Sequence, residues 1–114
     1  NSTLTPTLVD NLIFTITMEG FLVVIENRKG NIIRITDIFK QFKKKKRSKI
    51  KPVGFIVGSE NIYLTTDHGR LIIIDIALGR TKSILKIDSD KVSRPFVLNQ
   101  NLYIIKENSI IRLN

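Results

Sequence analysis

Gly69-Arg70-Leu71-Ile72-Ile73-Ile74-Asp75-Ile76-Ala77-Leu78-Gly79 is the stretch that decides the fold of this 114-residue chain. It contains a glycine, a short aliphatic run, an acid and a second glycine ten positions after the first. The run is too short to indicate a helix, and its β-branched residues favour a strand. Because the run does not alternate with polar residues, we expect both faces to be covered, with Ile73 and Ile74 buried. The preceding Asp67-His68 is typical of a hairpin turn with Gly69 at positive φ.

The same pattern recurs along the chain. The stretch from Gly20 to Gly30 repeats the glycine, aliphatic run, acid and glycine at the same spacing. A third, partial copy near the end has Asn108-Ser109 where the turn glycine would stand, and asparagine tolerates positive φ. Each copy follows a proline and a short apolar stretch, at positions 6, 52 and 95. The recurring positions, which we interpret as structural, are Gly20, Glu26, Gly30, Gly69, Asp75 and Gly79.

The repeat predicts short antiparallel strands grouped as in a β-propeller. A period of about 40 to 50 residues with four strands is typical of a propeller blade. We expect strands near Leu12–Thr17, Phe21–Glu26, Ile62–Thr66, Leu71–Asp75, Asn101–Ile105 and Ile110–Leu113. The sequence therefore predicts an all-β fragment of a larger propeller, with two full blades of four antiparallel strands and most of a third. The expected parts are blade repeats 1–39 and 52–88, a basic insert 40–51 and a partial repeat 89–114.

Exposed terminal blades have a consequence for assembly. Stacking covers the apolar faces of inner blades, but the outer faces of runs such as 71–74 and 110–111 would stay open. We therefore expect this piece to self-associate, away from the basic insert, whose like charges would repel.

The net charge of +9 comes from one segment. The chain has 19 basic and 10 acidic residues, and eight of the basic ones lie between positions 40 and 51 with no acid among them. The remaining 11 basic residues nearly balance the acids. The candidate interaction residues in the insert are Lys43, Lys44, Lys45, Lys46, Arg47 and Lys49.

Several uses of this basic insert stay open. It could face an anionic lipid surface, an acidic protein partner or RNA, or it could be a solvated loop that keeps an isoleucine-rich fold soluble. The spacing of Ile38, Phe39 and Phe42 predicts a helical turn beginning near Asp37 that places both phenylalanines on the propeller edge. Nucleic acid is the least favoured partner, because the aromatic residues Phe14, Tyr63 and Tyr103 occupy matching strand positions suited to packing between blades.

The repeat carries a family resemblance. The pattern Asp67-x-Gly69-Arg70-Leu71, with Asp75 and Gly79 following, resembles the quinoprotein-type (PQQ-like) β-propeller repeat. Within that superfamily the chain most resembles the outer-membrane protein assembly factor BamB and its relatives. The lysine-rich insert followed by 51–57 and 62–66 is similar to the C-terminal blades of such proteins in α-proteobacteria.

The resemblance implies a function and an alternative. It implies a non-enzymatic bacterial scaffold for protein–protein interaction, periplasmic and associated with the outer membrane, that assists assembly of β-barrel proteins. The alternative is a fragment of a PQQ-dependent dehydrogenase whose PQQ and calcium site lies outside this chain. Dehydrogenases of the superfamily carry a docking tryptophan four residues after the second glycine, where this chain has Arg34 and Ser83. Dehydrogenase-type docking between blades is therefore not expected.

Residue chemistry gives little indication of catalysis. With no cysteine, disulfides and thiolate metal sites are excluded. Asp88-Ser89-Asp90 could approach a hard cation, but a solvated turn is the better interpretation. His68 is the single histidine and fits a turn position. The sequence opens with Asn1 and contains no basic-then-apolar leader, so we expect a signal peptide to be absent or already removed. We therefore assign no catalytic, cofactor-binding or metal-ligating residue.

Overall fold

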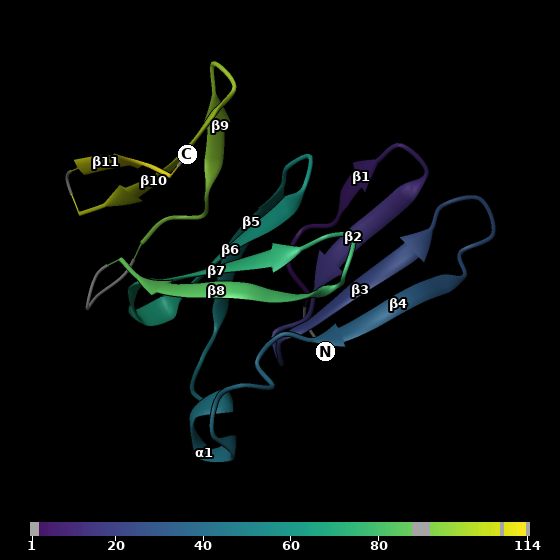
Figure 1. Cartoon of the computed structure of the whole chain (residues 1–114), viewed down its shortest axis with the longest axis horizontal. Helices are drawn as coiled ribbons and strands as arrows, with labels where there is room; N and C mark the ends of the chain where they lie inside the picture. The colour runs from purple at the N-terminus through teal and green to yellow at the C-terminus, as the bar shows by residue number, and fades with distance from the viewer. Residues whose placement is uncertain (1–2, 88–91, 108, 114) are drawn as a thin grey trace.

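The structure, a computed structural model that describes residues 3–87, 92–107 and 109–113, contains three antiparallel sheets (Figure 1). The first sheet consists of β1 (Thr7–Val9), β2 (Leu12–Ile16), β3 (Phe21–Glu26) and β4 (Ile32–Asp37). The second consists of β5 (Pro52–Val57), β6 (Asn61–Thr66), β7 (Arg70–Asp75) and β8 (Arg80–Lys86). The third consists of β9 (Phe96–Leu98), β10 (Asn101–Lys106) and β11 (Ser109–Arg112). A helix, α1 (Lys44–Arg47), and a 3-10 turn, η1 (Asp67–Gly69), complete the elements.

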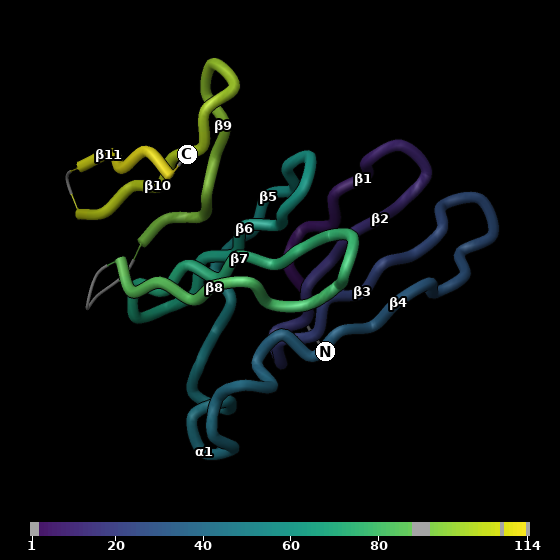
Figure 2. The backbone as a smooth tube through the Cα atoms, in the orientation of Figure 1, coloured from purple at the N-terminus to yellow at the C-terminus, as the bar shows by residue number. Residues whose placement is uncertain are grey.

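In each sheet the strands follow one another in chain order, so each sheet is a simple meander (Figure 2). The six strands expected from the sequence are all present, with ends shifted by about one residue. Sheets of four, four and three antiparallel strands fit a fragment of a propeller.

Glycine turns join the second and third strands of the first two sheets. Gly20 has φ 95°, and a Cβ there would lie 2.2 Å from a ring carbon of Phe39, so conformation and space both require glycine. In the second sheet His68 and Gly69 both have positive φ, at 61° and 68°. The Gly69 turn is therefore as the sequence predicted, and His68 shares its left-handed conformation. The corresponding Asn108 lies outside the described residues.

The first and second strands of each sheet pair in the same register. Thr7 pairs with Phe14, Ile56 with Tyr63 and Phe96 with Tyr103, and in each pair the partners are seven positions apart. Phe14, Tyr63 and Tyr103 thus occupy one equivalent position in three blades. Phe14 is buried, whereas both tyrosines are half-buried, and Tyr103 stacks on Phe96 with ring centroids 5.7 Å apart.

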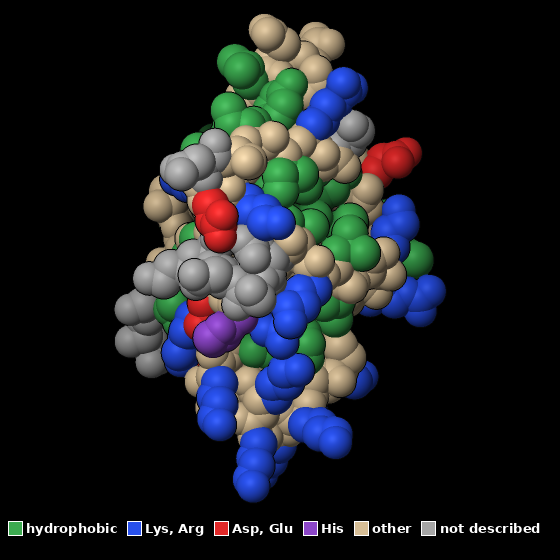
Figure 3. Space-filling view, turned by 90° about the vertical axis from the view of Figure 1, so that its left-hand side faces the viewer, with side chains coloured by type: hydrophobic (Ala, Val, Ile, Leu, Met, Phe, Trp, Pro, Cys, Tyr) green, Lys and Arg blue, Asp and Glu red, His purple; other side chains and the backbone are tan. Residues whose placement is uncertain are grey.

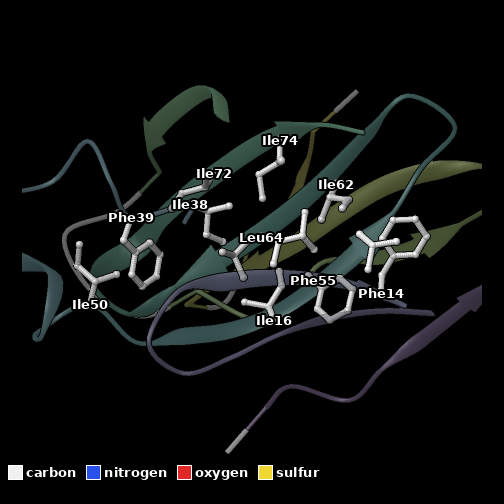
Figure 4. Packing of buried hydrophobic residues seen from close by; sticks show 12 residues of the cluster. Phe14, Ile16, Ile38, Phe39, Ile50, Phe55, Ile62, Leu64, Ile72 and Ile74 are labelled. Carbon is white, nitrogen blue, oxygen red and sulfur yellow. The ribbon is translucent and has the colours of Figure 1, made fainter. Parts of the chain in front are cut away.

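The main core lies between the first and second sheets (Figure 4). Strand alternation places the apolar side chains of β2 and β3 on one face, and it does the same for β6 and β7. These two faces pack together, and the segments flanking α1 add Ile38, Phe39 and Ile50 at one end of the cluster. The buried cluster is Phe14, Ile16, Leu22, Val24, Ile38, Phe39, Ile50, Phe55, Ile62, Leu64, Ile72 and Ile74.

The expectation that Ile73 is fully buried was wrong. Ile72 and Ile74 are completely inaccessible to solvent, but Ile73 points to the opposite face and is half-buried. On that side Tyr63 lines an open hollow of about 260 Å³ with Val97 and Leu102 of the third sheet. The third sheet therefore covers this face less tightly than the first sheet covers the other.

The sequence predicted open apolar faces at 71–74 and 110–111, and the prediction for 71–74 was wrong. The run 71–74 is covered by neighbouring sheets within the chain. Exposed aliphatic side chains occur on all three sheets, and those on the outer sides of the first and third sheets include Leu8, Ile32, Ile35, Ile105 and Ile110, which are 43–67% exposed.

Arg34 of β4 joins the outer parts of the first two sheets. Its guanidinium donates a 2.6 Å hydrogen bond to the Ile76 carbonyl and a 3.3 Å bond to the Ala77 carbonyl. Gly79 has φ 65°, which favours glycine, and a Cβ there would lie 2.7 Å from the Arg34 Nη1 atom and would displace the arginine. Arg34, four residues after Gly30, thus connects the first two sheets.

The alternation along β7 gives a paired stability prediction. Replacing the fully buried Ile72 with alanine should lower the free energy of unfolding by about 2–5 kcal/mol, because the core around it cannot collapse into the cavity. The control Ile73→Ala should cost clearly less, because Ile73 is half-buried. Urea unfolding followed by circular dichroism measures both. Equal losses would contradict the assignment of the tightly packed face.

Candidate functional site

The basic loop, which we define as residues 38–51, joins β4 of the first sheet to β5 of the second. It extends from one end of the molecule, and Lys and Arg side chains are prominent at that end in the space-filling view (Figure 3). Among its exposed lysines, five lie in and beside α1: Lys43, Lys44, Lys45, Lys46 and Lys49. Five exposed lysines this close together raise the local positive potential and attract anionic surfaces.

The loop is held to the body of the molecule at its beginning and its end. Ile38 and Phe39 are completely buried, and Ile50 is 2% exposed. At the end of the loop, the Lys51 amide donates a 2.8 Å bond to the Asp67 carboxylate, and the Asp67 amide donates to the Lys51 carbonyl at 2.8 Å. The lysines are therefore presented from a fixed base.

Arg47 differs from the five lysines. Its Nε donates a 2.8 Å hydrogen bond to the Phe42 carbonyl, and its Nη2 donates a 2.9 Å bond to the Lys40 carbonyl. The side chain is half-buried. Arg47 therefore braces the loop internally, although the sequence grouped it with the exposed candidates.

The predicted helical turn near Asp37 was wrong in position. The Ile38 amide still bonds to the Gly20 carbonyl, which extends the β4 ladder, and the Asp37 carboxylate accepts a 3.1 Å bond from the Phe39 amide. Both interactions hold this segment in a turn, and the helix begins only at Lys44. Phe42 is half-buried and meets Phe39 edge to face, with ring centroids 6.0 Å apart.

Two cations lie over the Phe42 ring. The Lys46 Nζ atom is 6.0 Å and the Arg70 guanidinium carbon 5.9 Å from the ring centroid. Cation–π attraction at this distance is worth about 0.5–1 kcal/mol at an exposed site. Phe42 therefore links the loop to β7 of the second sheet.

Glu26 and Asp75, the acids that recur in the repeat, end equivalent strands. The Glu26 carboxylate accepts hydrogen bonds from the Arg28 and Lys29 amides at 3.0 and 2.8 Å. The Asp75 carboxylate accepts one from the Leu78 amide at 2.8 Å. Both acids thus stabilise the turn that leads to the second glycine, at Gly30 or Gly79, each with positive φ.

The hydrogen bonds at Glu26 change its ionisation. The bond from the Lys29 amide is the main cause that lowers the pKa of Glu26 from its ordinary value of 4.5. Bonds from the Arg28 amide and the Asn11 side chain act in the same direction, while desolvation opposes them. Hydrogen bonds that stabilise the carboxylate favour its charged form.

The remaining chemical candidates form no centre in the described residues. His68 is 65% exposed, and its Nε2 lies 3.7 Å from the Asp67 carboxylate. Asp88-Ser89-Asp90 lies outside the described residues. No group of three or more metal-ligating side chains occurs within residues 3–87, 92–107 and 109–113. Across the same ranges, no helix is long and apolar enough to span a membrane.

Sequence reasoning missed two features at the joint between the first two sheets. One is the Arg34 contact, whose only signal was its position four residues after Gly30. The other is a groove of about 620 Å³ between β4 and β8. It is lined by residues 35–37, Lys40, Gln41 and 79–84, which are far apart in the chain, so no local pattern could indicate it.

Comparison with known proteins supports the fold. No known sequence family matches the chain, and no curated protein sequence matches it. Among solved structures, the chain is similar to the β-propeller domain of Cps50 (Swd1) from Myceliophteria thermophila, with 14% identity and a TM-score of 0.67. It is also similar to the quinohemoprotein alcohol dehydrogenase from Comamonas testosteroni, with 23% identity and a TM-score of 0.63, and to BamB from Moraxella catarrhalis, with 12% identity and a TM-score of 0.51.

These similarities establish the class of fold. They cover 84%, 88% and 96% of this chain but only 32%, 16% and 41% of the three solved structures. The chain therefore has an all-β, propeller-type fold and spans well under half the length of each of these proteins. Propellers of both the PQQ-enzyme and the BamB type are among its structural neighbours.

The pKa of Glu26 gives a prediction about pH. Because that pKa is lower in the folded chain, the carboxylate contributes stability above pH 4.5 that is lost as the pH falls through the folded value. Glu26→Gln should therefore be less stable than the wild type at pH 7, and the difference should shrink as the pH falls below 4.5. Urea unfolding across this range measures it, with Glu19→Gln as the charge-matched control. A difference independent of pH would contradict the assignment.

Proposed function

We propose that this chain is part of a non-enzymatic propeller scaffold that binds another protein through its basic loop. The observation that carries the proposal is the fixed presentation of five exposed lysines on a loop anchored by Ile38, Phe39 and Ile50. A loop held in this way loses less conformational entropy on binding than a mobile one. The complementary partner is an acidic protein surface.

The finer proposal follows the resemblance to BamB. We place the protein in the bacterial periplasm, at the outer membrane, where it assists assembly of β-barrel proteins. The repeat pattern and the lysine-rich insert support a match to the C-terminal blades of an α-proteobacterial relative, and the BamB-like propeller geometry is consistent with it. The partner would then belong to the assembly machinery.

Binding to that machinery is the direct test. The labelled periplasmic part of a β-barrel assembly machine is titrated with the chain, and fluorescence anisotropy measures the dissociation constant. We expect Lys43→Glu/Lys45→Glu to weaken binding about tenfold or more. The control Arg28→Glu/Lys29→Glu, which makes the same charge change in an exposed turn of the first sheet, should have a much smaller effect.

Three results would overturn this proposal. Absence of binding rejects the partner. Equal weakening by the two double variants would show that net charge alone, and not the position of the lysines, causes the effect. Tighter binding of the chain to vesicles rich in anionic lipid than to the protein assigns the loop to a membrane surface instead.

The second candidate is a fragment of a PQQ-dependent dehydrogenase, supported by the structural similarity to such enzymes. The two candidates differ in their response to cofactor. For the scaffold, adding PQQ with Ca²⁺ should leave the melting temperature unchanged. A ligand at about 100 times its dissociation constant would add about 2.7 kcal/mol of stability. A rise of several degrees in differential scanning fluorimetry would favour the dehydrogenase.

The outer apolar faces support self-association of this chain. Leu8 and Ile35 on the first sheet, and Ile105 and Ile110 on the third, are the kind of surface that an additional blade would cover. We expect light scattering at micromolar concentration to give a mass above 13.0 kDa. Ile110→Glu should shift the chain toward monomer, whereas Lys44→Glu in the basic loop should not. A wild-type monomer would contradict the expectation.

A further inference from the structure

The groove between β4 and β8 lies at the joint of the first two sheets, beside the Arg34 contact. β4 is the last strand of the first sheet and β8 the last strand of the second. Its volume is about 620 Å³, and residues 35–37 of β4 and residues 80–84 of β8 line its sides. Two strand edges that belong to different sheets therefore border one groove.

Both strand edges present backbone groups that have no hydrogen-bond partner within the described residues. The Ile38 amide bonds to the Gly20 carbonyl, and alternate residues of an antiparallel strand face its partner. The backbone N–H and C=O groups of Thr36 therefore face β3, whereas those of Ile35 and Asp37 face outward. By the same argument, the bond from the Ile87 amide to the Gly69 carbonyl turns the backbone of Ile84 outward.

The groove also has a polar, cationic lining. Lys40, Arg80 and Lys82 are exposed at the groove. The Asp37 carboxylate also lines it, but that carboxylate already accepts a hydrogen bond from the Phe39 amide. The Thr81 hydroxyl oxygen is buried in the groove wall and has no hydrogen-bond partner within the described residues. A buried polar group of this kind calls for a partner.

We infer that this groove binds an extended, acidic peptide segment of another protein, which adds as a further strand to the outward edge of β4 or β8. Added strands gain affinity from backbone hydrogen bonds, and pockets for alternate side chains supply specificity. The three cations complement acidic side chains, while Ile35 and Ile84 offer apolar contacts between them.

This inference extends the proposed scaffold role by naming a second site and its ligand, and it does not depend on the lysines at positions 43–49 that carry the first site. The competing explanation is protective, because lysines on an edge strand discourage pairing with other chains. That explanation predicts that no extended peptide binds. The two accounts therefore give opposite results in one experiment.

The probe is a fluorescein-labelled peptide of alternating glutamate and valine, about ten residues long to match a strand. Fluorescence anisotropy with the full chain measures binding at about 0.15 M salt, where distant charges are screened. We expect saturable binding. A peptide N-methylated on alternate residues, which removes donors from one edge, and a lysine–valine peptide should both bind about tenfold more weakly or not at all.

Variants of the chain test the site itself. Arg80→Glu/Lys82→Glu should weaken binding about tenfold, while the matched Lys44→Glu/Lys45→Glu in the basic loop should change it less than about twofold. Ile35→Pro removes one outward amide without removing a bond to β3, so it should weaken binding while the melting temperature is retained. If this variant fails to fold, the N-methylated peptide still tests strand addition.

Three results would overturn the inference. The first is that the glutamate–valine peptide does not bind, and the second is that the N-methylated peptide binds equally well. The third is that both charge-reversal variants weaken binding to the same extent. Failure here leaves binding through the basic loop intact, because that binding depends on Lys43 and Lys45 and is measured with a different partner.

Discussion

Contact between apolar sheet faces is the interaction on which the rest of this structure depends. A meander of four strands has two faces, and in this chain both are rich in isoleucine and leucine. Packing against another sheet removes such a face from water, and each fully buried aliphatic side chain contributes about 1.5–3 kcal/mol. The side chains of β2 and β3 meet those of β6 and β7 in this way. This contact also fixes the positions of the loops that connect the two sheets.

Both candidate binding features lie at that joint. The basic loop leaves β4 of the first sheet and enters β5 of the second, and its anchoring residues Ile38, Phe39 and Ile50 belong to the shared core. The groove is bordered by the last strands of the same two sheets. Arg34, bonded to the Ile76 carbonyl, fixes their relative position at the outer side. The chain thus presents a cationic projection and a pair of strand edges with fixed geometry, an arrangement that supports the proposed binding role.

The strands and the propeller class were predictable because they depend on local signals that repeat: glycine turns at Gly20 and Gly69, prolines before each copy, and β-branched runs. Predictions failed where tertiary contacts decide. A uniform apolar run does not reveal which face is tightly covered, so the burial of Ile73 was wrong. The spacing that predicted a helix near Asp37 is equally compatible with the turn held by the Asp37 carboxylate. The Arg34 contact and the groove join segments more than 40 positions apart, beyond the reach of any local pattern.

Native-state hydrogen exchange tests the central claim, that the first two sheets form one cooperative unit through a shared core. In the wild type, the slowest amides of β2, β3, β6 and β7 should exchange with a common free energy, and those of the third sheet should exchange faster. Leu64→Ala, a cavity at the centre of the contact, should lower protection in β2 and β3 as much as in β6 and β7. Loss of protection confined to the second sheet would show that the two sheets are stable independently and would contradict the account.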